Sequence, residues 1–226
     1  MANPRFRLPK TRLIIAMFIA IAAFSFSSCR KTVKESYRSG KPMSEKQFIG
    51  KKLDGKFTLW YESGSIQQQA LYRKDKLEGC MTRFYANGNK ELEENFSNGL
   101  KNGKSLSWDQ DGNLLEERNY TNDTLSGPYR MYYSSGVPKI EGHYSTGLYE
   151  GKWLYYSETG SKVGEGVFSK GSGILIGYDA QGHKIREVNY LKNRKNGKEI
   201  RFNPDGSIAE TLYYESDKLL KALKGQ

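Results

Sequence analysis

The sequence predicts an all-β protein: a repeat array of antiparallel β-hairpins that form an elongated, twisted single-layer sheet. Seven times a glycine is followed nine residues later by a second glycine, and successive pairs start 24 residues apart, with one step of 22. No stretch between residues 55 and 214 has the length or the three-to-four spacing of a helix. Such a regular period indicates one supersecondary unit repeated along the chain. The pairs are Gly55/Gly64, Gly79/Gly88, Gly103/Gly112, Gly127/Gly136, Gly151/Gly160, Gly173/Gly182 and Gly197/Gly206.

Two aromatic columns accompany the glycines. We number positions from the first glycine of each repeat, which is position 0; positions 5 and 17 are aromatic in every repeat. We expect these two columns to share one face of the sheet and to pack as cross-strand pairs that hold the array together. The position-5 residues are Trp60, Phe84, Trp108, Tyr132, Tyr156, Tyr178 and Phe202. The position-17 residues are Tyr72, Phe96, Tyr120, Tyr144, Phe168, Tyr190 and Tyr214.

Each unit is predicted to be a hairpin followed by a polar linker. The first strand runs into a short polar turn that ends at the second glycine, as in Glu62-Ser63-Gly64, and glycine supplies the positive φ that such turns need. The second strand ends at position 17, and a linker such as residues 73–78 leads to the next repeat. The 22-residue step is short within residues 169–172, where we expect a tighter turn. An even deletion keeps each side chain on its own face.

A column of carboxylates occupies position 14 on the second strand, on the face opposite to position 17. Nearby lysines are frequent, so we interpret this column as a solvated face with weak ion pairs. A track that binds a cation or another ligand is the alternative. The residues are Glu93, Glu117, Glu141, Glu165 and Glu187.

The pattern G-x-x-x-x-W/Y/F-Y-x-x-G, followed by an acidic strand that ends in an aromatic residue, resembles the MORN-variant repeat. The nearest likeness is to a bacterial multi-repeat group described as antitoxin-like, and the resemblance covers residues 55–214. It implies a single-layer, twisted antiparallel sheet with scaffolding or membrane-associated roles.

A degenerate unit precedes the seven repeats. Projecting the register back by 24 residues places Tyr37 at position 6 and Phe48 at position 17, with Lys31 in place of the first glycine. Terminal units of an array are atypical because they shield an open end. We therefore assign residues 29–54 to an anchor segment and a capping repeat.

The tail, residues 215–226, has no glycine in register. It carries Leu219, Leu220 and Leu223 among lysines. This spacing fits a short amphipathic turn of helix laid over the last strand, and a frayed terminus is the alternative.

The N-terminus resembles a bacterial lipoprotein signal. A basic segment is followed by an apolar run from Leu13 to Phe24 and by a small-residue site that ends in Cys29. Twelve apolar residues are too few to span a bilayer permanently. The resemblance implies that residues 1–28 are removed and that Cys29 carries the lipid. A plain signal peptide with a coincidental cysteine and a single-pass anchor are the alternatives. Arg30 and Lys31 favour the outer over the inner membrane of a bacterial envelope.

Charge and cysteine content fit an exported protein. Removal of residues 1–28 takes away four basic residues and no acidic one, which lowers the formal net charge from +11 to +7. An exported basic chain meets anionic lipid head groups and envelope polymers, so we expect no nucleic-acid partner. If Cys29 is acylated, only Cys80 remains, and no internal disulfide can form.

Catalytic chemistry has few residues available. The two histidines, His143 and His183, occupy different positions in different repeats, which disfavours a paired metal site or a Ser/His/Asp arrangement. Adjacent acidic pairs such as Glu93 and Glu94 point to opposite faces of a strand. We therefore expect no enzyme activity, no metal and no cofactor.

The sequence predicts a membrane-anchored repeat scaffold whose partner is a protein or an envelope polymer. A glycan or cell-wall binding module, or an antitoxin-like neutralising partner of a toxin, is the alternative. Aromatic residues on the other face of the first strand vary between repeats and are therefore the better contact candidates. A contiguous exposed patch formed by them would favour a binding role. These candidate contact residues are Tyr61, Tyr85, Tyr129, Tyr133, Trp153 and Tyr155.

Overall fold

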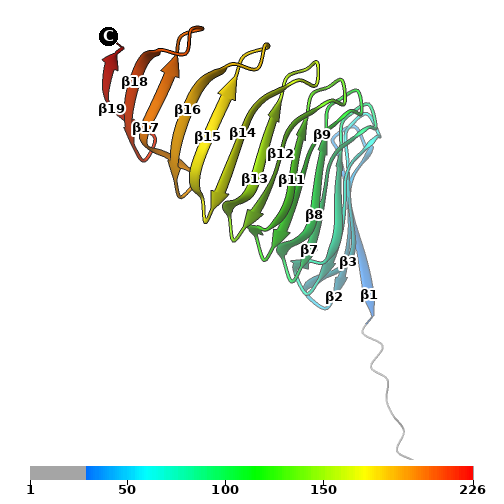
Figure 1. Cartoon of the computed structure of the whole chain (residues 1–226). Coiled ribbons are helices and arrows are strands. Elements are labelled where there is room, and N and C mark those ends of the chain that lie inside the picture. Colours follow the sequence, from blue (N-terminus) through cyan, green and yellow to red (C-terminus); the bar gives the residue numbers. More distant parts are fainter. Residues whose placement is uncertain (1–28, 226) are drawn as a thin grey trace, which may run out of the picture.

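A computed structural model describes residues 29–225 as one antiparallel sheet of 19 strands that does not close on itself (Figure 1). The strands follow one another in chain order from one end of the sheet to the other, and the sheet is visibly twisted. The predicted all-β repeat fold is confirmed. Residues 29–225 include no helix that could cross a membrane. The predicted signal peptide lies outside the described residues.

The strands are short and regular. Strands β5 and β6 both pair with β4, and strands β10 and β11 both pair with β9. β5 and β6 together therefore occupy one strand position in the sheet, and so do β10 and β11. The strands are β1 (Arg30–Ser36), β2 (Pro42–Ile49), β3 (Lys52–Trp60), β4 (Ile66–Arg73), β5 (Lys76–Leu77), β6 (Gly79–Phe84), β7 (Lys90–Ser97), β8 (Leu100–Trp108), β9 (Leu114–Thr121), β10 (Thr124–Leu125), β11 (Gly127–Tyr132), β12 (Pro138–Ser145), β13 (Leu148–Tyr156), β14 (Lys162–Ser169), β15 (Ser172–Tyr178), β16 (Lys184–Leu191), β17 (Arg194–Phe202), β18 (Ile208–Glu215) and β19 (Lys218–Lys224).

Two kinds of tight turn alternate along the chain. In the first, the Gly64 N–H donates to the Tyr61 carbonyl at 2.9 Å and Gly64 has φ +101°, as in a three-residue hairpin loop. In the second, two successive residues have positive φ, for example Lys74 (51°) and Asp75 (70°), as in a two-residue type I′ turn. The linkers are therefore hairpin turns as well, and each strand pairs with the next.

A bulge marks the start of nearly every repeat. Between the Glu94↔Ser105 pair and the Phe96↔Lys101 pair, β8 has three residues where β7 has one. Gly103 lies within these extra residues and has φ +107°, a conformation that residues with a side chain rarely adopt. The same two-residue excess occurs at six of the seven junctions that precede a repeat glycine.

The β14–β15 junction lacks the bulge. Its ladder runs without a shift from Gly164↔Gly177 to Ser169↔Ser172. The turn at residues 170–171 has the same two-residue length as the others, so the expectation of a tighter turn is wrong: the two missing residues are those of the bulge. Gly173, alone among the seven repeat glycines, does not have a positive φ.

Hairpin register places the two aromatic columns on opposite faces. Position 2 pairs with position 15, as in Trp153↔Gly166, and position 3 pairs with position 14, as in Leu154↔Glu165. Odd positions of the first strand therefore share a face with even positions of the second, because paired residues project to the same side. The expectation that positions 5 and 17 pack together is wrong. We call the side with positions 2, 15 and 17 the core face, and the side with positions 3, 5 and 14 the glutamate face.

An aromatic cluster covers the core face from β11 to β16. Trp153 is 2 % exposed and stacks on Tyr129 at a centroid distance of 5.6 Å. Glycines make room for these rings: a Cβ on Gly142 would meet the Trp153 ring, and Gly166 is the cross-strand partner of Trp153. The buried members are Tyr129, Trp153, Phe168, Leu175 and Val188, with Met131, Ile140, Tyr144, Tyr149, Tyr155 and Tyr190 packed around them.

Charged residues replace this cluster elsewhere on the core face. Glu94 is buried beside Lys101, whose Nζ lies 2.5 Å from its carboxylate. Glu199 is fully buried and accepts hydrogen bonds from Lys195 Nζ at 2.8 Å and Arg201 Nε at 3.2 Å. Burial alone would raise the pKa of Glu199, but these two cations outweigh it and hold the pKa below its ordinary value.

Both ends of the array are strands. β1 and β2 form a hairpin over the residues where the register places the degenerate unit, and the Tyr37 hydroxyl donates to the Trp60 carbonyl at 2.5 Å. The tail forms β19, which pairs with β18 from Glu215↔Lys218 to Glu210↔Lys224. The expected helical turn is wrong, because the open edge of β18 offers backbone hydrogen bonds to an extended chain.

Candidate interaction surface

Three of the six predicted contact residues lie in the core. Trp153 is 2 % exposed and Tyr129 is 8 % exposed, and Tyr155 is half-buried against the same cluster. Burial raises the pKa of the Tyr155 hydroxyl well above its ordinary value. They lie opposite to position 5, as predicted. That face was expected to be exposed because positions 5 and 17 were assigned to one packed face without the register of the hairpin.

The other three form a row of clasps between repeats. The hydroxyl of Tyr61 donates to the Phe84 carbonyl at 2.8 Å, and that of Tyr85 donates to the Trp108 carbonyl at 2.8 Å. Tyr133, two repeats beyond Tyr85, makes the same contact to the carbonyl of Tyr156 at 2.9 Å. These part-buried hydroxyls join successive hairpin loops. The six residues therefore do not form the contiguous exposed patch that would have favoured a binding role for them.

On the glutamate face, the position-14 carboxylates are occupied by neighbours. Glu165 accepts a hydrogen bond from the Tyr178 hydroxyl at 2.9 Å and pairs with Lys162 Nζ at 3.2 Å. The Tyr178 hydrogen bond, followed by Lys162, lowers the pKa of Glu165. The Tyr132 and Tyr156 hydroxyls bond the preceding position-14 glutamates in the same way, each at 3.2 Å. Basic side chains pair with this column, as expected, but its carboxylates are half-buried and engaged in internal contacts, so the face is less solvated than predicted.

Lysines also cover several position-5 rings on this face. The ammonium of Lys90 lies 5.4 Å from the ring centroid of Trp108, and that of Lys184 lies 4.4 Å from that of Phe202. These are cation–π distances. The rings are half-buried, so this aromatic column is part of the packing between repeats.

Asparagines at position 16 hold the bulges in place. Asn95 lies opposite the β8 bulge, and its side-chain amide donates to the carbonyl of the residue nine positions later at 2.9 Å. Asn119 and Asn189 make the same contact at 2.7 and 3.0 Å. We call this contact the asparagine clamp. The sequence analysis missed it, although the recurring Asn at position 16 was a visible signal.

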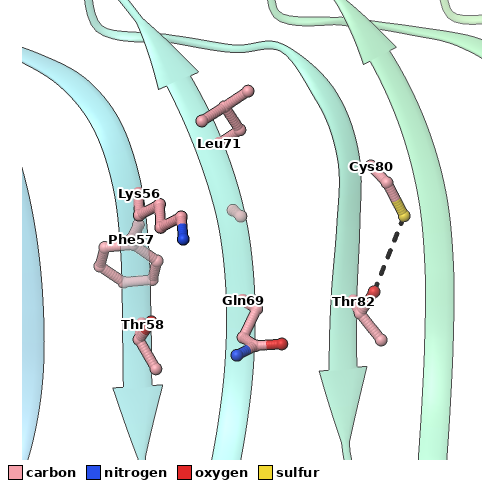
Figure 2. Close-up of a pocket in the computed structure, with 8 residues that line it drawn as sticks. Lys56, Phe57, Thr58, Gln69, Leu71, Cys80 and Thr82 are labelled. Carbon is pink, nitrogen blue, oxygen red and sulfur yellow. Dashed lines mark hydrogen bonds between the residues drawn. The ribbon is translucent and has the colours of Figure 1, made fainter.

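Leu71 breaks the clamp near the start of the array. Figure 2 shows Leu71 on β4 and Cys80 on β6, with Thr82 below Cys80. An open depression lies here, and the Cys80 Sγ is 3.7 Å from the Thr82 hydroxyl. Leu71 is 44 % exposed. Without an amide at position 16, the surface over this bulge is left partly apolar.

Val167 breaks the clamp at the junction that has no bulge. It pairs directly with Ile174 across β14 and β15, and the two are 69 % and 43 % exposed. They lie in an open depression of about 530 Å³, which Ile176, Lys152 and the two carboxylates Glu165 and Glu187 also line. Since an unbulged ladder needs no clamp, apolar residues occupy the places that Asn and Lys hold elsewhere. We call this the β14–β15 depression.

Among residues 29–225, no three His, Cys, Asp or Glu side chains converge to hold a metal ion. His183 lies in a hairpin loop, where its Nδ1 is 3.1 Å from Asp179 Oδ2. His143 lies exposed at position 16 on the glutamate face, far along the chain from it. The structure does not bring the two histidines into one site.

Residues 53–145 of the chain are similar to a known repeat. Four stretches match the MORN repeat variant. They are residues 53–74, 77–98, 101–122 and 125–145, and each begins two residues before a repeat glycine. The four matched repeats all have the bulge, and the matched stretches end before the unbulged junction. Comparison with curated proteins finds no match.

Proposed function

We propose that this chain is a non-catalytic repeat scaffold, held at a membrane of a bacterial envelope by lipid on Cys29, which presents its glutamate face to a protein or envelope partner. The observation that carries the proposal is that recurring polar residues of that face are engaged in internal contacts, whereas its exposed apolar residues are not. The position-14 carboxylates of that face are held in ion pairs, and three position-16 asparagines clamp bulges, whereas Leu71, Val167 and Ile174 are exposed at junctions without the clamp. Repeat arrays bind through such extended surfaces.

The anchor fits the geometry of the described residues. Cys29 is exposed and directly precedes β1, so a lipid there is attached at one end of the sheet. At about 4.8 Å per strand, the array extends on the order of 75 Å from that end. A scaffold of this length holds its distal repeats well away from a membrane surface. The outer membrane is the location we favour.

A glycan-binding module is the second candidate. Its support is the half-buried column of position-5 rings on the glutamate face. Lysine ammonium groups over Trp108, Tyr178 and Phe202 occupy the space in which a sugar would stack, which favours the protein-binding proposal. The antitoxin-like alternative is a special case of the same proposal, in which the protein partner is a toxin.

Metabolic labelling with a palmitate analogue tests the anchor. We expect the wild-type chain and the Cys80→Ala variant to be labelled and to sediment with membranes. The Cys29→Ala variant should lose the label and remain uncleaved at that site. Label retained on Cys29→Ala would contradict the proposed anchor.

A further inference from the structure

The β14–β15 depression combines a highly exposed apolar residue, apolar neighbours and a charged rim. Val167, at 69 %, is the most exposed of the large apolar residues that stand out from the surface. Its neighbours Ile174 and Ile176 extend the apolar surface across β15. Charged side chains of both signs surround it, in the pattern of an apolar centre with a polar rim that marks protein-binding sites.

The depression is backed by the buried cluster of the core face. The strands that carry it, β13 to β16, hold Trp153, Phe168, Leu175 and Val188 on the opposite, core face, all nearly fully buried. A continuous ladder without a bulge joins β14 to β15. A surface held in place in this way loses little conformational entropy on binding.

Lys152 is the charged group with capacity for a new partner. Its Nζ lies 3.6 Å from Glu165, and its side chain is 62 % exposed. Glu165 already accepts the Tyr178 hydroxyl and pairs with Lys162, and Glu187 pairs with Lys184 at 3.2 Å. A carboxylate brought to the rim therefore has a cation to pair with.

We propose that the β14–β15 depression is the docking site for a protein partner that inserts an apolar side chain between Val167 and Ile174 and places an adjacent carboxylate on Lys152. This inference rests on the proposed scaffold function and names the partner's chemistry. Charge supports an acidic segment: residues 29–226 carry a formal net charge of +7, which attracts acidic proteins and repels a second copy of the chain.

Photo-crosslinking in the cells that produce the protein tests the site. p-Benzoyl-phenylalanine replaces Val167 in the full chain, and a matched chain carries it in place of Leu71, the exposed apolar residue of the other depression. Adducts are sequenced by mass spectrometry. We expect position 167, and not position 71, to give an adduct with a protein segment in which an apolar residue stands next to Asp or Glu.

The sequenced segment is then synthesised and titrated against the purified chain. Val167→Asp and Lys152→Glu should each weaken binding at least about tenfold, the loss expected for an anchoring residue. Exchanging the acidic residue of the peptide for Lys should restore binding to Lys152→Glu, and circular dichroism should show an unchanged sheet.

Four results overturn the inference: an adduct with lipid, an adduct with a second copy, a segment without an acidic residue, or no adduct at position 167 above that at position 71. A protein adduct at position 71 alone would leave the scaffold function standing while it removes this site. Absence of any protein adduct at both positions would count against the scaffold function on this face as well.

Discussion

The β7–β8 and β14–β15 junctions connect repeats in different ways. At β7–β8, the Glu94↔Ser105 pair is buried on the core face, a two-residue bulge follows, and Asn95 clamps the bulge from the glutamate face. At β14–β15, there is no bulge or clamp, and Val167 pairs with Ile174 in solvent. The comparison shows that the 24-residue period consists of two strands, two turns and a two-residue bulge.

The difference also separates structural from variable residues. The repeat glycine adopts positive φ wherever it lies in a bulge. Asn recurs at position 16 because the bulge leaves a backbone carbonyl without its ladder partner, and the Asn amide donates to it. Neither glycine at position 0 nor Asn at position 16 is required where the two bulge residues are missing. Neither constraint acts on Val167 and Ile174 at the shortened junction, where the two form an exposed apolar pair.

The largest effect should come from the apolar backing of the shortened junction. Trp153→Ala should lower the free energy of unfolding by about 3–5 kcal/mol, because it empties the centre of the aromatic cluster. Ser105→Ala at the same repeat position should cost about 1 kcal/mol or less, since Ser105 donates only one long hydrogen bond, at 3.4 Å. Urea melts followed by circular dichroism measure both. Equal losses would mean that the two halves of the core face are equivalent.

A buried carboxylate should contribute more to the free energy of unfolding than an exposed one, and it should do so only above acidic pH. Glu199→Gln should cost about 3 kcal/mol at neutral pH, because it leaves Lys195 and Arg201 without their anion. The folded-state pKa of Glu199 is lowered, so its contribution is present above the ordinary pKa of about 4.5 and is lost as the pH falls through the lower folded value.

Melts between pH 7 and pH 3 check this pH dependence. The difference between wild type and Glu199→Gln should shrink on acidification. Glu165→Gln, on the exposed glutamate face, serves as the control and should change stability much less at every pH. A Glu199→Gln effect that is constant across this range would contradict the assignment.

The role of the repeat glycine can be tested with two alanine substitutions. Gly103→Ala should cost about 1–3 kcal/mol, because an alanine there must adopt φ near +107°. Gly177→Ala, on the unbulged β15, should be nearly neutral, since its φ is ordinary and a Cβ would meet its nearest neighbour, Arg186 Cβ, at 3.5 Å. Thermal melts compare them. A neutral Gly103→Ala would show that the bulge does not require glycine.

The clamp should have the smallest effect. Asn119→Ala should cost about 1 kcal/mol, the net value of a hydrogen bond, because the Pro128 carbonyl loses its 2.7 Å donor. Val167→Ala, at the same repeat position without a clamp, should stay within about 0.5 kcal/mol. Chemical denaturation in parallel distinguishes them. A larger loss for Val167→Ala would indicate that Val167 has a structural role.

The repeat period predicted the fold because each glycine and aromatic column recurs for a local backbone reason. Tyr61 was visible as a recurring residue, but its role depends on a carbonyl 23 residues away, which becomes a neighbour only when hairpins stack. The face that carries Trp153 was expected to be exposed for a related reason. Alternation along a strand fixes relative faces within that strand, whereas the register between strands depends on where the loop closes.

The apolar pair at the shortened junction could be read only in part from the sequence. The missing two residues were evident, but the pattern could not show whether the turn or the bulge was lost. That choice decides whether Val167 faces Ile174 directly. The lysines over the position-5 rings likewise come from neighbouring repeats, so no single repeat reveals them.

Cysteine accessibility tests the central claim, which is that the core face holds the array while the shortened junction turns apolar residues to solvent. Val167→Cys and Val188→Cys are matched substitutions at sites 69 % and 1 % exposed, made in a chain with Cys29→Ser and Cys80→Ser. Maleimide should modify residue 188 at least about 100-fold more slowly than residue 167, because labelling it requires local opening of the core. In urea the two rates should become equal. Equal rates in the native protein, or faster labelling at 188, would contradict the account.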